Sequence, residues 1–152
     1  MNPFERYLTF EDREHIAVVN HLKSKHPDIV SIHVPNEGRK SAFERYKHSV
    51  MGALKGAPDF VILEPKTVKK TDSSGVVYLE LQYYGLLIEL KAQEHNRVVL
   101  KGKFAGKVVK TKGKVSPEQL DVLNRLTAKK YRAVACFGAE EAIKEIDNYL
   151  KK

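Results

Sequence analysis

The sequence predicts an α/β protein whose mixed central sheet is flanked by helices. Short apolar runs bounded by turn residues indicate buried strands, and they include Phe60–Leu63, Leu86–Leu90 and Ala133–Phe137. Longer amphipathic segments alternate with these runs in the order α-β-α-β-β-hairpin-α-β-α, which favours a layered sheet covered by helices. A chain of 152 residues, 42% of them hydrophobic, is expected to form a single domain over residues 1–152.

The first predicted helix runs from Phe10 to about Lys25. Thr9 is a good N-cap, with Asp12 three positions on in a capping-box pattern, and Pro27 stops the helix. The residues expected on its core face are Ile16, Val19 and Leu22.

A short strand is then expected from Ile29 to Val34, followed by a loop whose breaker residues are Pro35–Gly38. A second helix is expected from Ser41 to Leu54, ending at Gly56. Phe60–Leu63 is the next strand.

Lys66–Ser74 is polar and is expected to lie outside the sheet. A strand over Val76–Leu81 follows the turn residues Asp72–Gly75. The central strand is Leu86–Ala92, whose apolar residues fall on both faces, as in an interior strand.

The C-terminal third begins with a basic hairpin formed by Val98–Leu100 and Lys107–Lys110. Ser116 caps a helix that opens at Pro117 and continues to about Lys129. Its expected core face is Leu120, Leu123 and Leu126. A buried strand over Ala133–Phe137 and an amphipathic helix over Glu140–Leu150 complete the chain, with Ile143, Ile146 and Leu150 inward.

Charge is concentrated in one segment. The net charge is +8, and between residues 92 and 115 seven basic residues stand against one acid, Glu94. Such clustering is typical of a polyanion partner, and the alternative is a solvated lysine-rich hairpin that aids solubility.

The remaining composition indicates a cytoplasmic protein. Cys136 is the single cysteine, which excludes an internal disulfide and indicates a buried thiol. No apolar stretch approaches the roughly 20 residues that span a bilayer, and the N-terminus lacks the apolar core of a signal peptide. The histidines show no His-x-x-x-His spacing, so a zinc site is not expected.

Three charged residues fall in or beside the buried strands. Glu89 and Lys91 share one face of the central strand because side chains alternate. Asp59, at the mouth of Phe60–Leu63, can complete an acidic pair. Two carboxylates and a lysine suit metal-assisted phosphodiester cleavage. The alternatives are a turn role for Asp59 after proline and a structural ion pair between Glu89 and Lys91.

This arrangement resembles the PD-(D/E)XK nuclease superfamily, and further motifs make the chain similar to the VRR-NUC family in its small, single-domain, phage-like form. The matching motifs, in order, are Pro35–Arg39, Lys55–Asp59, Gly85–Lys91, Val115–Gln119 and Asn148–Leu150. The resemblance covers nearly the whole chain and implies a restriction-endonuclease-like fold. Residues 92–115 then form a basic hairpin insertion.

The resemblance implies a site for Mg²⁺ or Mn²⁺. Asp59, Glu89 and the Leu90 carbonyl would hold the metal, and Lys91 would stabilise the transition state. Gln119 would orient Lys91 or the attacking water, although Ser116 and Gln119 also form a capping box that could be its entire role. Glu14, or less suitably Glu11, would face the metal; the alternative is that the helix dipole explains both acids.

The activity implied is a metal-dependent, structure-selective endodeoxyribonuclease acting at Holliday or other branched junctions, in a homodimer. The alternatives are a restriction-like or nicking nuclease on duplex or flap DNA, and a non-catalytic nucleic-acid-binding module. The basic residues expected to hold DNA phosphates are Arg39, Lys40, Lys55, Lys101, Lys103, Lys107 and Lys110.

Overall fold

The structure is a computed structural model that describes residues 3–34 and 41–151. The chain divides into two compact units, and β5 and β8 contribute residues to both. Unit 1 comprises Met1–Asp28, Leu90–Val115 and Ala135–Lys151. Unit 2 comprises Ile29–Glu89 and Ser116–Val134, with Lys152. The expectation of a single domain stays a prediction.

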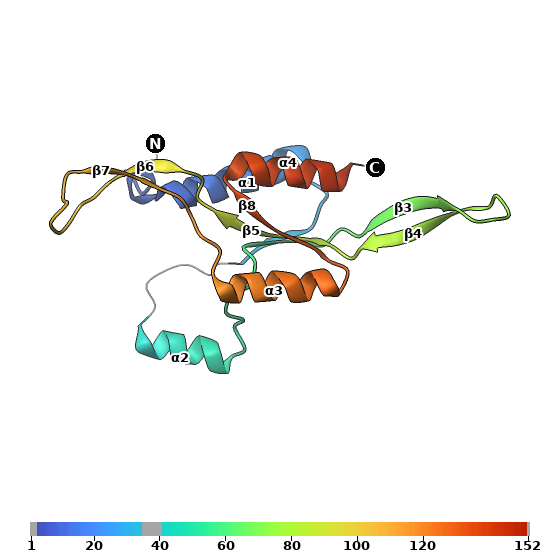
Figure 1. The fold of residues 1–152 in the computed structure, drawn as a ribbon, viewed down its shortest axis with the longest axis horizontal. Coiled ribbons are helices and arrows are strands. Elements are labelled where there is room, and N and C mark those ends of the chain that lie inside the picture. Colours follow the sequence, from blue (N-terminus) through green and yellow to red (C-terminus); the bar gives the residue numbers. More distant parts are fainter. Residues whose placement is uncertain (1–2, 35–40, 152) are drawn as a thin grey trace. The chain divides into compact units, whose positions relative to one another are not determined.

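The central sheet has four strands in the order β1 (Ser31–His33), β2 (Phe60–Ile62), β5 (Leu86–Lys91) and β8 (Arg132–Phe137) (Figure 1). β1 pairs with β2, and β2 with β5, in antiparallel register. β5 and β8 run parallel, because the Arg132 amide donates to the Gly85 carbonyl and the Gly138 amide to the Lys91 carbonyl, six residues further along both strands. The sheet is therefore mixed, and the predicted fold class is confirmed.

Unit 1 contains the 3₁₀ turn Glu5–Tyr7, the helices α1 (Phe10–Lys25) and α4 (Ala139–Leu150), and a hairpin of β6 (His95–Val98) and β7 (Val108–Thr111). α1 has the predicted bounds, and Thr9 and Asp12 form the predicted capping box. α1 packs against α4. The side chains buried in this unit include Val18, Leu22, Leu90, Cys136, Ala142, Ile146 and Tyr149.

The predicted core face of α1 is wrong in part. Ile16 is 42% exposed, whereas Glu14, Val18 and Leu22, spaced four residues apart, are the buried residues of the helix. This spacing defines a helical stripe, but its first position is a glutamate. Because the buried stripe of α1 begins with a charged residue, a prediction based on apolar periodicity alone placed the core face on the neighbouring side of the helix.

Unit 2 contains α2 (Ala42–Val50), a hairpin of β3 (Lys66–Thr71) and β4 (Val77–Tyr83), and α3 (Pro117–Ala128). The segment Lys66–Ser74, expected to lie outside the sheets, contributes β3. Its lysines remain solvated because the hairpin is exposed, so its polar composition did not prevent pairing with β4. The turn at Asp72 is confirmed: Asp72 Oδ1 accepts from the amides of Ser74 and Val76.

The core face of α3 also differs from the prediction. Leu120 is 53% exposed, whereas Val122 and Leu123 are buried and Leu126 is half-buried. The half-buried Gln119 completes this stripe at the helical spacing 119, 122, 123 and 126. As in α1, a polar residue stands at an inward position and shifts the apparent apolar face.

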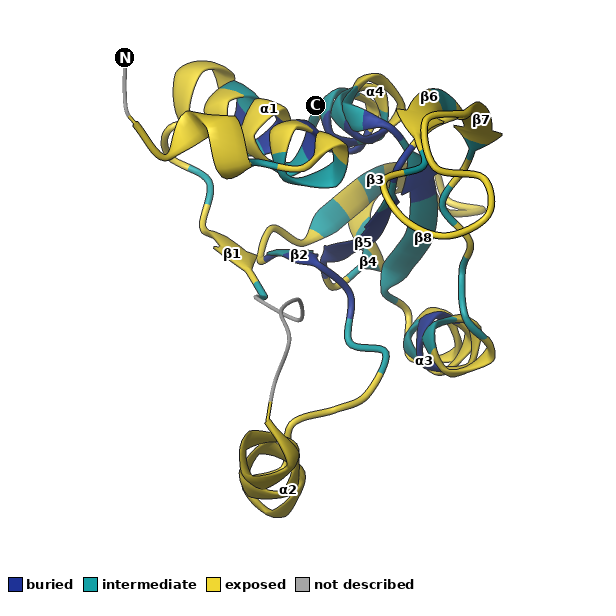
Figure 2. Cartoon of the chain, turned by 90° about the vertical axis from the view of Figure 1, so that its left-hand side faces the viewer, coloured by how far each residue is buried: buried dark blue, intermediate teal, exposed yellow. Residues whose placement is uncertain are grey.

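Burial is concentrated in the sheet, as the dark blue of β2 and β5 in Figure 2 shows. Every β5 residue from Leu86 to Leu90 is buried, which confirms that this is an interior strand. α2, by contrast, buries none of its residues. The Cys136 side chain is buried, as predicted. Among the described residues, no helix combines the length and apolar character that crossing a membrane requires.

Candidate active site

The register of β2 and β5 brings the two predicted acidic residues together. Phe60 pairs with Ile88 and Ile62 with Leu86. Continuing this antiparallel register by one residue places Asp59 opposite Glu89. Directly opposite residues project their side chains from the same face of a sheet, with Cβ atoms about 4.5–5.5 Å apart. Asp59 and Glu89 are 4% and 1% exposed, so the two carboxylates share a buried position at the end of β2.

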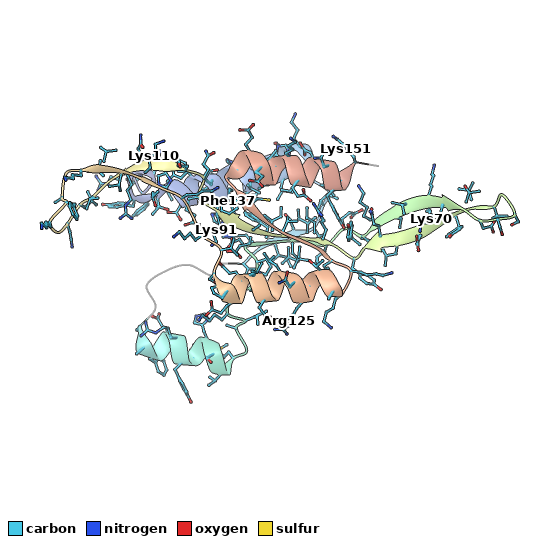
Figure 3. The ribbon with its side chains drawn as sticks, in the orientation of Figure 1. Lys70, Lys91, Lys110, Arg125, Phe137 and Lys151 are labelled. Atoms are coloured by element: carbon cyan, nitrogen blue, oxygen red, sulfur yellow. The ribbon has the colours of Figure 1, made fainter. Side chains whose placement is uncertain are left out.

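Lys91 follows Glu89 by two residues on β5 and therefore projects from the same face of that strand. It is half-buried at the end of the strand, where Figure 3 labels it. The Lys91 carbonyl accepts from the Gly138 amide at 2.8 Å, which fixes the backbone at this point. Glu89 and Lys91 therefore share one face of β5.

Gln119 makes two kinds of contact at once. The side-chain Oε1 of Gln119 accepts from the Ser116 backbone N–H at 2.8 Å. The backbone N–H of Gln119 donates to Ser116 Oγ at 3.2 Å, which completes the capping box of α3. Its Nε2 meanwhile donates to Glu89 Oε1. The capping role and the site role, posed as alternatives, are compatible, because they use different atoms of one amide group.

Gly56 allows the loop that leads to Asp59 to approach α3 closely. Its φ is +81°, and a Cβ atom at this position would lie 2.8 Å from the backbone carbon and oxygen of Glu118. A larger residue cannot fit without moving backbone. The glycine of the Lys55–Asp59 motif therefore has a physical reason: it lets the loop and the Gln119 end of α3 meet.

Lys55, predicted to contact DNA, is bonded to Glu118 within this contact. Its Nζ donates to Glu118 Oε1, and the two side chains are 80% and 44% exposed. The Lys55 hydrogen bond, together with hydrogen bonds within α3, lowers the pKa of Glu118 to about 2. Lys55 thus reinforces the loop–helix contact while remaining largely open to solvent.

Glu14 lies in unit 1 and caps α4. Its Oε2 accepts from the Ala139 amide, and its Oε1 accepts from Gln93 Nε2 at 3.2 Å. The N-cap of α4 is Gly138, which has no side chain to serve this purpose. A carboxylate at a helix N-terminus is favoured by the orphan amides and by the helix dipole. These contacts explain why a glutamate occupies the inward stripe of α1.

The basic segment forms a hairpin, as predicted, but its first strand, β6, shares only Val98 with the predicted Val98–Leu100, whereas β7 lies within one residue of the predicted Lys107–Lys110. The four lysines predicted to contact phosphates are exposed; Lys110 lies 3.2 Å from Glu94, and Lys107 lies over the Phe104 ring (Figure 3 labels Lys110). Gly113 closes the hairpin against β5, where its amide donates to the Ala92 carbonyl at 2.8 Å. Lys40 and the whole Pro35–Arg39 motif, Arg39 included, lie outside the described residues.

The sequence predicted Ser116 as a helix cap but not its part in orienting Gln119. The Ser116 backbone N–H donates to Gln119 Oε1, and the Ser116 hydroxyl accepts from the Gln119 backbone N–H, while Gln119 Nε2 donates to Glu89. The Ser-x-x-Gln capping box was the signal in the sequence. It indicated the start of a helix, but not that the Gln119 side chain would contact a buried carboxylate.

The donor set suits a hard divalent cation. Two buried carboxylates supply oxygen ligands, which Mg²⁺ and Mn²⁺ prefer over nitrogen or sulfur. Two negative charges side by side in a buried position are costly without a cation to neutralise them. The residues present therefore fit such an ion.

The fold is similar to that of a solved structure, a VRR_NUC domain protein. The TM-score is 0.61 at 22% sequence identity, and the alignment covers 94% of this chain and 89% of that chain. No protein-family model and no curated protein matches the chain. The likeness establishes a shared fold over nearly the whole length of both chains.

Proposed function

We propose that this chain is a metal-dependent DNA endonuclease of the VRR-NUC kind, within the PD-(D/E)XK superfamily and in its small, phage-like form. The observation that carries the proposal is the β2–β5 register, which pairs Phe60 with Ile88 and, continued by one residue, would bring Asp59 opposite Glu89. Lys91 follows Glu89 by two residues on the same strand. The VRR_NUC domain protein that shares the fold supports a nuclease over an unrelated use of these carboxylates.

Asp59, Glu89 and the Leu90 carbonyl would hold Mg²⁺ or Mn²⁺. A hard divalent ion, when bound, lowers the pKa of a water ligand and polarises a phosphate oxygen. Glu14 stays outside this proposed ligand set, because both of its oxygens already accept hydrogen bonds within unit 1.

Lys91 and Gln119 would act through position. The Lys91 ammonium, held on a rigid strand, would stabilise the negative charge that accumulates on the phosphate in the transition state. Gln119 would act as a positioning residue, because its Nε2 fixes the orientation of Glu89. The proton lost by the attacking water would pass to solvent or to a phosphate oxygen.

The substrate would be branched DNA, such as a Holliday junction. The exposed lysines of the β6–β7 hairpin offer contacts to phosphates, which position a duplex without reading its sequence. Such contacts favour selection by shape over selection by sequence.

A symmetric junction suits a C2 homodimer, and α2 offers a surface for one. The large apolar residues of α2 and of the segment that follows it are all more than half exposed, although such residues usually face a core: Phe43, Tyr46 and Val50 in the helix, and Met51 and Leu54 after it. Light scattering on a sizing column tests this part. We expect twice the monomer mass for the wild type, and a monomer for a variant with Phe43→Ser and Val50→Ser.

Cleavage of a labelled four-way junction, with Mg²⁺, Mn²⁺ and EDTA in parallel, tests the activity. A flap and a linear duplex of the same sequence serve as matched substrates. We expect cleavage of the junction with either metal and none with EDTA. Equal cleavage of all three substrates would refute branch selectivity, and cleavage of none would refute the nuclease assignment.

A further inference from the structure

We propose that His21, His26 and Asp147 form a zinc site that joins the end of α1 to α4 within unit 1. The Nε2 atoms of both histidines lie 2.8 Å from the same oxygen, Asp147 Oδ1. The three ligand atoms all lie within 4.8 Å of one another. Among the described residues, this is the one group of three His, Cys, Asp or Glu side chains whose ligand atoms converge in this way.

The ligand atoms of His21, His26 and Asp147 favour a different class of ion from the one that the Asp59–Glu89 carboxylates favour. Two imidazole nitrogens and one carboxylate oxygen are typical ligands of Zn²⁺, whereas Mg²⁺ and Mn²⁺ prefer oxygen ligands alone. Three protein ligands leave a fourth tetrahedral position for water.

The three ligand atoms would have to rearrange to receive the ion. Zinc lies about 2.0–2.1 Å from each ligand, so two tetrahedral ligands are about 3.3 Å apart. The observed separations of 2.8 Å are hydrogen-bond lengths. Each histidine would move away from Asp147 by about half an ångström and exchange one hydrogen bond for a metal bond. The imidazole nitrogens, which lie within 4.8 Å of one another, would also have to reach a separation of about 3.3 Å. Rotation of the imidazoles about their side-chain bonds can supply such a movement.

The end of α1 creates this convergence. Residues five apart on a continuous helix lie on different faces, since each residue turns the helix by about 100°. His26, however, is the C-cap, with φ −134° and ψ 52°, and it leaves the helical path just before Pro27. The break turns its ring back toward His21, and the two rings meet edge to face with centroids 5.6 Å apart. Regular His-x-x-x-His spacing was therefore the wrong pattern to seek.

The surroundings keep the site partly shielded and negatively charged. The side chains of His21 and His26 are 17% and 23% exposed, and that of Asp147 is 41% exposed. Burial acts to raise the pKa of Asp147, but hydrogen bonds from His26 and His21 outweigh it and lower the pKa. The carboxylate is thus anionic at neutral pH, and an ion can reach it from solvent.

Metal titration of the untagged chain, without a polyhistidine sequence, tests the proposal. Zn²⁺ binding is measured by calorimetry, and Co²⁺ is used as a probe whose visible absorption reports four-coordinate nitrogen and oxygen ligation. We expect one Zn²⁺ per chain in the wild type and also in Glu89→Gln, which alters the carboxylate pair. At a zinc concentration 100 times Kd, the melting temperature should rise by about 5–11 °C.

Three variants and one control localise the ion. His21→Gln, His26→Gln and Asp147→Asn should each weaken Zn²⁺ binding more than about 100-fold, because loss of an outer-shell partner alone costs 10–100-fold. His15→Gln, on the same helix, should bind as the wild type does. Far-ultraviolet circular dichroism establishes that each variant is folded.

Absence of Zn²⁺ and Co²⁺ binding by the wild type would overturn the proposal, and the three residues would then be a hydrogen-bonded cluster alone. Binding that survives in folded His21→Gln and His26→Gln, or that is lost in Glu89→Gln, would also overturn it, because the ion would then lie elsewhere.

Discussion

Replacing Gln119 by glutamate tests whether the hydrogen bond from Gln119 to Glu89 stabilises the fold. The new carboxylate can still accept from the Ser116 amide, so the capping box is preserved, but it cannot donate to Glu89 Oε1 as the Gln119 Nε2 does. Glu89 is 1% exposed, so solvent cannot replace the missing donor. Removing one hydrogen bond to a charged buried group costs about 1.5–3 kcal/mol.

This cost should be visible in the unfolding of the metal-free protein. For a chain of this size, 1 kcal/mol shifts the melting temperature by roughly 2–4 °C, so Gln119→Glu should melt about 3–12 °C below the wild type. Chemical denaturation gives the free energy of unfolding independently. The readout does not depend on any activity.

Two further variants separate the contributions. Ser116→Ala removes the hydroxyl of the capping box and keeps the Gln119–Glu89 bond, so it should cost about 0.5–2 kcal/mol and leave cleavage close to wild type. The double variant Glu89→Gln with Gln119→Glu exchanges donor and acceptor, and should regain at least half of the stability that Gln119→Glu loses. A free energy of unfolding for Gln119→Glu within about 0.5 kcal/mol of the wild type would refute the reasoning.

Three other outcomes are expected. Asp59→Ala and Glu89→Ala should lower junction cleavage by at least roughly 10²–10³ while DNA binding in EDTA is retained, and cleavage above a hundredth of the wild-type rate in either would sink the metal-ligand assignment. Glutamine at the four hairpin lysines 101, 103, 107 and 110 should reduce the salt slope of DNA binding by about 0.9 for each lysine that touches a phosphate. Exposed lysines elsewhere serve as a control for that set: Lys69, Lys129, Lys144 and Lys151. An unaltered slope would instead favour a dimer interface on the hairpin, in which case Val99→Asp with Val108→Asp should give monomers. Glu14→Gln should destabilise the fold by about 0.5–2 kcal/mol because α4 loses a charged cap, yet keep cleavage within about tenfold; loss of cleavage without loss of stability would identify Glu14 as a metal ligand instead.

The strands of the central sheet were predictable because their signal is local. Leu86–Leu90 is apolar at four of five positions, and a run of this kind has few options other than an interior strand. The capping boxes at Thr9 and Ser116 were predictable for the same reason, since both partners lie within four residues. β3 was missed because its lysines are solvated on an exposed hairpin, where pairing with β4 rather than burial determines the structure.

The contacts that build the site were not local. The bond from Gln119 to Glu89 spans 30 residues, and the bond from Glu14 to Ala139 spans 125. No periodicity within one element contains such information. Asp59, Glu89 and Lys91 could be proposed as site residues from residue type alone, but the expectation that Asp59 lies opposite Glu89 needed the β2–β5 register.

The errors on α1 and α3 have one physical cause, and it is informative about the site. In each helix the inward stripe holds one polar residue, Glu14 or Gln119, and each of these satisfies a group that the fold would otherwise leave in need of a partner. Glu14 accepts from the first amide of α4, and Gln119 donates to a carboxylate buried in β5. A buried polar residue is retained in a helix only where its hydrogen bonds offset the cost of its burial. In both helices, therefore, the observed burial departs from the predicted apolar face where the helix carries a polar contact inward, and in α3 that contact reaches Glu89.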